Sequence, residues 1–193
     1  MGRKRQFSDD KVLRQAEELF WAKGYAATTY ETLARETGVT ARSLVNAFGD
    51  KDQLFLLCLD NYIDKVRGFV DECTPRPGCD AIVRFLRAIA ASPPDHMRNQ
   101  GCLMVNIIPA LDGLAEGARD RVEAFRDLFI EHFERALEAD GVPDAPRRAR
   151  LLVTLLWGMS AEIRHAGDVQ AIVPVVAEME TLLRAWQEDA AYA

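Results

Sequence analysis

Apolar residues recur along the chain every three or four positions, which is the spacing of one face of an α-helix. The first such stripe consists of Val12, Ala16, Leu19 and Phe20. No segment alternates apolar and polar residues as a half-buried strand would. The sequence therefore predicts an all-α fold of about nine helices.

Start and stop signals divide the first 72 residues into four predicted helices. Ser8 is placed to cap the first helix, with Phe7 and Val12 as a hydrophobic staple, and Gly24 ends it. The later signals are a Thr28/Glu31 capping box for a second helix that ends at Gly38, Thr40 as the cap of a third helix over 41–47, and an Asp50/Gln53 capping box for a fourth helix over 50–72.

The stretch TPRPGCD (74–80) interrupts this pattern with two prolines and a glycine, so we place a domain boundary there. The chain then divides into residues 1–52 and 74–193, with the fourth helix as the connection. Further helices are expected over 81–91, 102–111, 118–139, 147–166 and 169–189. Pro174 lies inside the last of these, so that helix either begins late or bends.

The composition, 49% hydrophobic and 28% charged in 193 residues, is typical of a soluble globular protein. No apolar run approaches the roughly 20 residues that span a bilayer, and no apolar segment of a signal peptide follows the basic start, so a cytoplasmic location is expected. The four cysteines should then be reduced, and their spacing suits no metal site. We predict neither a metal nor a cofactor.

The net charge of −6 is unevenly distributed. Residues 1–70 hold 11 Lys/Arg and 10 Asp/Glu, whereas residues 71–193 hold 13 and 20. The first part includes a basic arm, Arg3 to Arg5, which is suited to phosphate groups but is also typical of a solvated tail. The acidity therefore does not exclude a nucleic acid as partner of the first part.

The spacing of Ala34, Gly38, Val39 and Leu44 narrows the function further. Ala34 is small enough for a second short helix to cross closely, and Gly38 can adopt a positive φ at the turn. Val39 and Leu44 can then pack beneath the pair. Such an arrangement is a helix-turn-helix, whose second helix enters the major groove of DNA. An αα-corner in a helical bundle uses the same spacing.

Four motifs occur in order in the first third of the chain: A-x-x-L-F-x-x-K-G-Y-x-x-T-T (16–29), L-A-x-x-x-G-V-T (33–40), Phe48, and D-K-x-x-L (50–54). Together they resemble the N-terminal domain of TetR-family transcriptional regulators. The resemblance implies an N-terminal helix-turn-helix domain and a C-terminal domain for ligand sensing and dimerisation. It also implies a homodimer that binds double-stranded operator DNA, most often as a repressor.

The resemblance assigns DNA contacts to Thr28, Thr40, Ala41, Arg42, Ser43, Asn46 and Lys51. Thr28 and Lys51 stand where family members touch phosphates. Arg42 could reach guanine and Asn46 an adenine edge. Val45 replaces a tyrosine that commonly contacts a phosphate, so either the affinity is lower or Arg42 and the basic arm supply more of it.

The family arrangement implies that the helices over 147–166 and 169–189 form the dimer interface. Their apolar stripes are Leu151, Leu152, Leu155, Leu156, Met159 and Ile163 in the first, and Ile172, Val176, Met179, Leu183 and Trp186 in the second. Two such helices late in the chain favour a partner. The alternative is that both stripes close the core of the chain itself.

Candidate ligand residues are Phe125 and Phe129, which lie on one helical face with Phe133, and Trp157 with its neighbour Met159. Stripes of this kind more often belong to a core than to a pocket. The side chains alone do not decide between the two.

Cys102 lies in NQGCLMVN (99–106), which looks like the G-C-L-x-V-N element of a TetR branch that includes the nem repressor and answers reactive electrophiles. A helix N-terminus and nearby Arg98 would favour its thiolate, which could be alkylated or oxidised. A small buried thiol that merely packs is the alternative.

The sequence thus predicts a regulator released from DNA by an unidentified small molecule or electrophile. The competing hypothesis is an all-helical enzyme or binding protein with a vestigial helix-turn-helix. No nucleophile with a base at a telling spacing, phosphate loop or H-E-x-x-H motif supports an enzyme.

Overall fold

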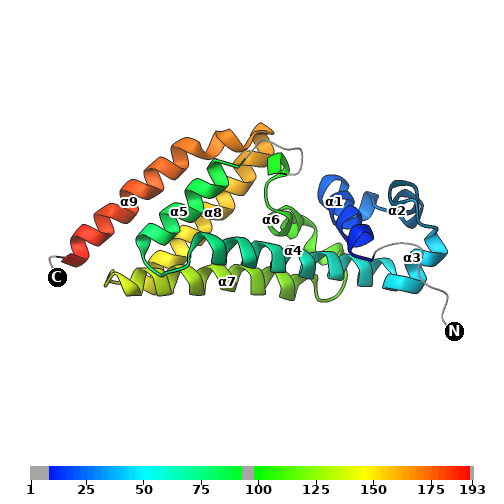
Figure 1. Ribbon diagram of the computed structural model, residues 1–193, viewed down its shortest axis with the longest axis horizontal. Coiled ribbons are helices and arrows are strands. Elements are labelled where there is room, and N and C mark those ends of the chain that lie inside the picture. The colour runs from blue at the N-terminus through cyan, green and yellow to red at the C-terminus, as the bar shows by residue number, and fades with distance from the viewer. Residues whose placement is uncertain (1–8, 93–97, 192–193) are drawn as a thin grey trace.

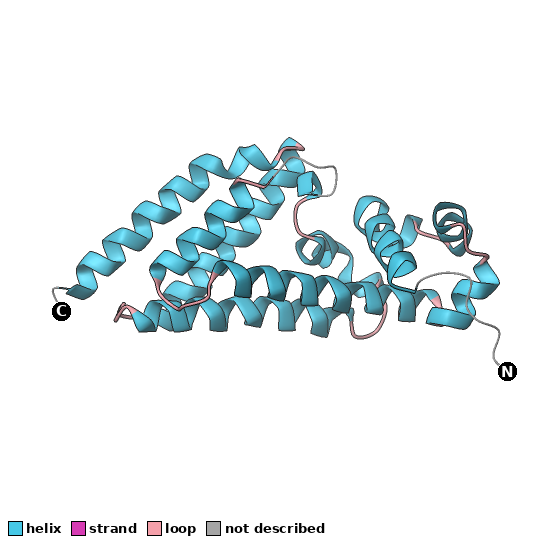
Figure 2. Ribbon diagram, viewed as in Figure 1, coloured by secondary structure: helices cyan, strands magenta, loops and turns pink. Residues whose placement is uncertain are grey.

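The computed structural model describes residues 9–92 and 98–191, and the regular elements in these ranges are all helical (Figure 2). Within them lie nine α-helices, in agreement with the predicted all-α fold. In chain order these are α1 (Asp9–Ala27), α2 (Tyr30–Thr37), α3 (Ala41–Phe48), α4 (Lys51–Cys73), α5 (Cys79–Ala90), α6 (Leu103–Ile107), α7 (Ala118–Ala139), α8 (Ala145–Ala166) and α9 (Val173–Ala191). The predicted cap Ser8, its staple partner Phe7 and the basic arm lie outside the described residues.

Capping residues set the ends of α2, α3 and α4. Gly38 ends α2 in the left-handed conformation at φ 69°. The Thr40 hydroxyl accepts a hydrogen bond from the Ser43 amide at 3.2 Å and so begins α3. Asp50 and Gln53 form the predicted reciprocal capping box at the start of α4. These local signals fix where the short helices begin.

The predicted cap of α2 is wrong by one residue. Thr29 caps the helix, because its hydroxyl accepts from the Thr32 amide at 3.3 Å. Thr28 is instead fully buried, and its hydroxyl donates to the Gly24 carbonyl at 2.8 Å. Gly24 kinks the end of α1 at φ 78° and ψ 168°, which brings its carbonyl within reach of Thr28.

Helices α1, α2 and α3 gather at one end of the molecule, on the first part of α4 (Figure 1). Their shared core contains Phe20 from α1, Leu33 from α2, Leu44 from α3 and Phe55 from α4, none more than 1% exposed. Burial of these side chains fixes α3 relative to α4.

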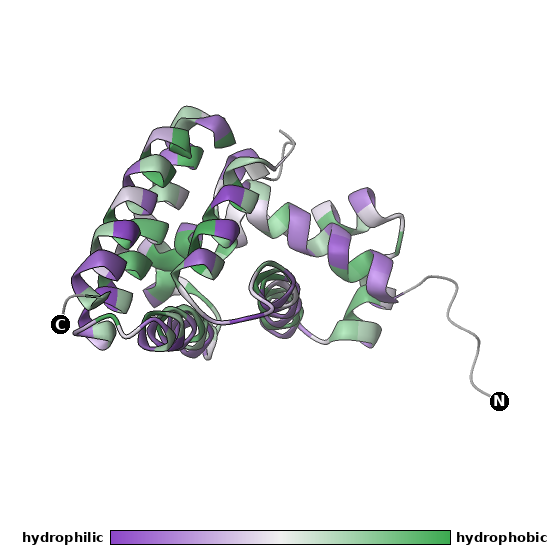
Figure 3. Cartoon of the chain, turned by 60° about the vertical axis from the view of Figure 1, so that its left-hand side comes forward, coloured by the Kyte–Doolittle hydropathy of each residue, from purple (hydrophilic) through white to green (hydrophobic). Residues whose placement is uncertain are grey.

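The long helix α4 continues into a second group of helices, where α7 runs beside it (Figure 1). Helix α7 contacts both α8 and α4. Helix α9 lies against α5. Hydrophilic and hydrophobic bands alternate along these helices (Figure 3), as amphipathic helices that share one core require.

Prolines explain two differences from the predicted helices. The helix expected over 102–111 is only α6, followed by a 3-10 segment over Ile108–Gly113, because Pro109 has no amide to continue α6. Another 3-10 segment, Val169–Ile172, precedes α9, so the last helix begins late. Pro174 then lies in its first turn, where the missing amide costs little. Within the described ranges, no helix combines the length and apolar character needed to cross a membrane.

Candidate DNA-reading helix and internal cavity

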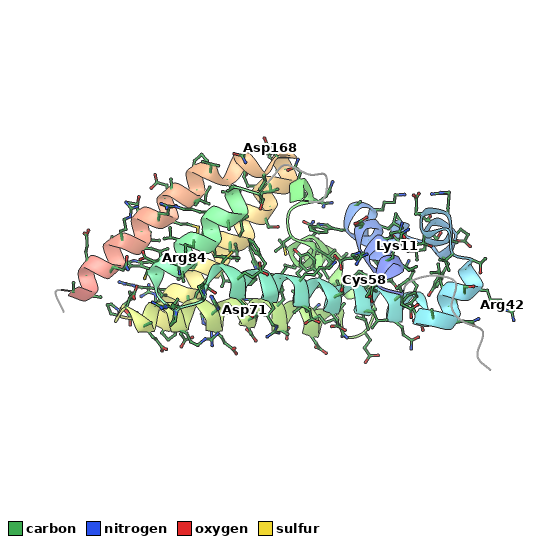
Figure 4. All side chains as sticks on the ribbon, viewed as in Figure 1. Lys11, Arg42, Cys58, Asp71, Arg84 and Asp168 are labelled. Carbon is green, nitrogen blue, oxygen red and sulfur yellow. The ribbon has the colours of Figure 1, made fainter. Side chains whose placement is uncertain are left out.

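Helix α3 buries one face and exposes the other. Leu44 is fully buried, whereas Arg42, Val45 and Asn46 are exposed, Val45 by 45%. In Figure 4, Arg42 points away from the rest of the molecule at the end opposite α9. The outer face of α3 thus offers a guanidinium, an amide and an apolar group, which are three of the kinds of side chain that read base edges.

The other residues predicted on this helix lie at its N-terminus. Thr40 is exposed, while Ala41 and Ser43 are half-buried. The Thr40 and Ser43 hydroxyls lie 2.9 Å apart and hydrogen-bond to each other. The structure therefore brings Thr40, Ala41, Arg42 and Ser43 together in the first turn of α3, next to the exposed Asn46.

Lys51 begins α4, directly after α3. Its ammonium lies over the Tyr25 ring, 4.0 Å from the ring centre, and the Tyr25 hydroxyl donates a hydrogen bond to Asp52. Burial and this bond to a carboxylate raise the pKa of Tyr25 to about 12. Tyr25 therefore stays neutral, and the cation–π contact with its ring positions the Lys51 ammonium at the N-terminal end of α4.

Thr28 does not join this surface. Its side chain is fully buried and its hydroxyl is occupied by the Gly24 carbonyl, so it cannot reach a phosphate. The exposed residue at the N-terminus of α2 is Thr29. Two adjacent threonines look alike in the sequence, and only the fold determines which of them is buried.

A cavity of about 540 Å³ lies where α1, α4, α5, α6, α7 and α8 meet. Its lining includes all four predicted ligand residues, namely Cys102, Phe125, Phe129 and Trp157. Sequence reasoning missed several other lining residues, notably Glu17, Trp21, Tyr62, Lys65, Phe69 and Phe85. Helical periodicity marks most of these as inward-facing, but it does not show which inward faces leave a space between them.

Cys102 stands at the start of α6 on the wall of this cavity. Its thiol accepts a hydrogen bond from the Tyr62 hydroxyl at 3.4 Å, and its amide donates to the Ser160 hydroxyl at 2.7 Å. Burial raises the pKa of the Cys102 thiol, and the Tyr62 bond opposes that effect only in part. The expectation that the site favours a thiolate is therefore wrong. The side chain of Arg98, which was expected to help, lies outside the described residues.

A buried carboxylate forms part of the same cavity. Glu17 of α1 is only 4% exposed, and its oxygens accept from the Lys65 ammonium at 2.9 and 3.1 Å and from the Asn61 amide at 2.5 Å. Lys65 and Asn61 both lie on α4, so their bonds to Glu17 link α1 to α4 beside the cavity.

Known proteins resemble this chain along most of its length. Residues 12–58 match the tetR family of bacterial regulatory proteins. The HTH-type transcriptional regulator YezE of Bacillus subtilis (strain 168) is 30% identical over 142 residues, which cover 70% of this chain and 73% of YezE. The chain belongs to the TetR family.

Other TetR-family relatives are similar over nearly the whole chain. The transcriptional repressor ComR of Escherichia coli (strain K12) is 28% identical over 198 residues, which cover 97% of this chain and 92% of ComR. A cysteine mutant of the TetR family regulator CifR, complexed with 26-base-pair double-strand operator DNA, superposes with a TM-score of 0.79 at 28% identity. That alignment covers 96% of this chain and all of the CifR chain. These relatives are transcriptional regulators and not enzymes, which agrees with the prediction.

The electrophile-responsive branch of the TetR family remains a prediction for this chain. The reduced form of E. coli NemR has a TM-score of 0.77 but only 17% identity, over 88% of this chain and 93% of that structure. Likeness at this level shows the fold alone.

The stripes of α8 and α9 mostly close the core of this TetR-family chain itself. The residues of the two stripes that are buried within the chain are Leu152, Met159, Ile163, Ile172, Val176, Met179, Leu183 and Trp186. Their assignment to a partner interface is therefore wrong, and the alternative of an internal core holds for them. Leu151 is 45% exposed, Leu155 and Leu156 are half-buried, and Val173 at the start of α9 is 46% exposed.

Proposed function

We propose that this chain is a homodimeric repressor that binds a palindromic operator through α3. A small molecule or reactive electrophile that reaches the cavity releases it from the DNA. Residues 1–52 form the DNA-binding domain, and residues 74–193 form the sensing and dimerisation domain. The exposed polar face of α3 and the operator complex of CifR, a relative at 28% identity, support the DNA-binding part.

One series of contacts carries the proposed regulation. The bonds of Cys102 to Tyr62 and Ser160 join α4, α6 and α8 at the cavity wall. On its other side, Tyr62 packs edge-on against Trp21 of α1, with 5.2 Å between ring centres. A ligand in the cavity, or an adduct on Cys102, would therefore shift α1 and α4, the helices that position α3.

A dimer provides the second α3 helix. Two copies about 34–36 Å apart read successive turns of one DNA face and match a palindrome. The exposed Leu151 and Val173 supply apolar surface on α8 and α9 for such a partner.

A gel-retardation assay with fragments of the gene's own upstream DNA tests this function. We expect a retarded band whose affinity falls steeply with salt, because phosphate contacts release counterions. If no upstream fragment is retarded at low salt, the proposal fails and a helical small-molecule-binding protein becomes the better reading.

Arg42→Ala and Lys51→Ala should have different effects on DNA affinity. Loss of a base contact at Arg42 should weaken operator binding by about 1–3 kcal/mol and relax specificity, while random DNA is little affected. Loss of the Lys51 charge should weaken binding to both DNAs and reduce the salt slope by about 1. Arg67→Ala, an exposed position in the second half of α4, is the control. Equal losses on operator and random DNA for Arg42→Ala would contradict its role.

Cys102→Ser should keep operator binding but abolish release by N-ethylmaleimide. The sulfur forms a C–S bond as the π bond of the maleimide double bond breaks; the thiol proton goes to water, and the other carbon of the double bond takes a proton from water. The adduct adds bulk where Tyr62 now bonds. Because burial raises the pKa of Cys102, the thiolate fraction, and with it the release rate, should rise about tenfold per pH unit between pH 7 and 8.5. The half-buried Cys73, changed to serine, is the matched control. Release that persists in Cys102→Ser removes this thiol from the mechanism.

A further inference from the structure

Helix α3 exposes one large apolar side chain, Val45, on the face that carries the predicted base contacts. Val45 is 45% exposed, whereas its neighbour Leu44 is fully buried in the core of the chain. Exposure alone would mean little, because single apolar side chains are common on protein surfaces. Val45, however, stands three residues after the exposed Arg42 and directly before the exposed Asn46. It therefore belongs to the same outward surface as these two side chains.

Val45 gains little from its own chain. A β-branched side chain favours a helix less than alanine, leucine or arginine does, so a valine makes the eight-residue α3 slightly harder to form. Nearly half of its surface stays in water, so burial within the chain offsets this cost only in part. The remaining apolar surface is free for another molecule.

The major groove of DNA offers one partner for such a side chain. Base edges there present hydrogen-bond donors and acceptors, and the 5-methyl group of thymine is their one methyl group. The Val45 side chain can neither donate nor accept a hydrogen bond, and against a polar edge it would remove hydration without compensation. It also cannot replace the phosphate contact of the tyrosine that is common at this position. We propose that Val45 contacts the 5-methyl group of a thymine and makes that base a determinant of operator specificity.

The spacing on α3 places this thymine relative to the guanine proposed for Arg42. Side chains three positions apart on a helix are neighbours, with about 5–6 Å between their Cβ atoms. Successive base pairs are about 3.4 Å apart. The thymine should therefore lie one or two base pairs from that guanine in each half-site. This inference rests on the proposed operator binding and adds to it one base of the operator and the residue that reads it.

Deoxyuridine in place of thymidine deletes the 5-methyl group and leaves base pairing unchanged, so it tests this contact directly. The probe is the upstream fragment that the protein retards, prepared with either nucleoside throughout. Burial of one methyl group corresponds to about a fourfold gain in affinity, so a dimer with two such contacts should bind the thymine probe roughly 15-fold more tightly. Val45→Ser deletes both methyl groups of the side chain. Its ratio of affinities for the two probes should be at least about fourfold smaller than that of the wild type.

Two further variants control for shape and for exposure. Val45→Ile keeps a branched apolar end and should keep the wild-type ratio within about twofold. Leu57→Ala removes a side chain that is 42% exposed on α4, and it should leave the ratio unchanged. Because every protein meets the same two probes, any effect of deoxyuridine on DNA flexibility is common to all of them. Equal wild-type affinity for the two probes overturns the inference, and so does a ratio that Val45→Ser leaves unchanged or that Val45→Ile reduces as much as Val45→Ser does.

Single replacements locate the base. Deoxyuridine at one thymine and at its symmetry mate should reproduce most of the loss, one or two base pairs from the guanine whose replacement no longer matters in Arg42→Ala. A loss spread evenly over many thymines overturns the assignment to Val45. The two proposals fail differently. If no upstream fragment is retarded, the repressor function fails and this inference with it, whereas a retarded fragment without thymine preference leaves the repressor function intact and overturns this inference alone.

Discussion

Phe55→Ala is expected to lower the free energy of unfolding by about 3–5 kcal/mol, the usual cost of truncating a fully buried phenylalanine. Phe55 is 0% exposed and joins α4 to α1, with its ring centre 5.0 Å from that of Phe20 and 4.9 Å from that of Tyr25. The loss is a large part of the 5–15 kcal/mol that holds a typical domain folded. Operator binding should fall as well, because this contact sets the position of α1, α2 and α3 on α4.

Urea unfolding followed by circular dichroism, at one fixed protein concentration, measures this effect. Leu57→Ala is the matched control, since Leu57 lies on the same helix but is 42% exposed. It should change the free energy of unfolding by no more than about 0.5 kcal/mol. Hydrogen exchange should show the loss in residues 9–48 more than in α7 and α8. A Phe55→Ala protein within 1 kcal/mol of the wild type would contradict the role of this contact.

The helix ends could be predicted from the sequence where the capping bonds join residues only a few positions apart. The caps at Thr40 and at Asp50 with Gln53 act through bonds to residues three positions away, so the sequence contains both partners. The one cap predicted wrongly, Thr28, is also explained by a contact between residues close in sequence. The kink at Gly24 offers a carbonyl to the nearer of two adjacent threonines, and only the next one remains for α2.

The candidate site was harder to predict, because its parts meet only in the folded chain. Cys102 and Tyr62, which are in contact in the structure, are 40 residues apart in the sequence. The residues near Cys102 in the sequence, Gly101 and Arg98, therefore do not reveal the burial that raises the pKa of the Cys102 thiol. The spacing of its phenylalanines reveals the aromatic stripe of α7, but no pattern in the sequence places Trp21 of α1 at the same cavity. For α8 and α9, an apolar stripe has the same pattern whether its own chain or a partner covers it, which is why the assignment of residues such as Leu183 failed.

Gly101 is the position where a small change should have a second large effect. It adopts φ 72°, and a methyl group there would overlap the Ser160 carbonyl oxygen of α8 and stand 2.9 Å from its hydroxyl oxygen. Gly101→Ala therefore combines the cost of a left-handed alanine, about 1–2 kcal/mol, with an overpacking cost of about 1–3 kcal/mol. We expect the free energy of unfolding to fall by about 2–5 kcal/mol.

Two other glycines separate these contributions. Gly38 has φ 69°, and a methyl group added there would meet open space. Gly38→Ala should therefore lower the free energy of unfolding only by the cost of a left-handed alanine. Gly68 lies inside α4, toward its C-terminal end, and a methyl group added there would meet no atom within 4 Å, so Gly68→Ala should raise the free energy of unfolding by about 0.5–1 kcal/mol. Beyond stability, the alanine at 101 should push α6 from α8 and strain the bond between the Cys102 amide and Ser160. If that bond couples the cavity to α8, Gly101→Ala should weaken effector-driven release more than Gly38→Ala does, measured as the ratio of operator affinities with and without effector. Equal ratios in the two variants would show that this contact is structural only.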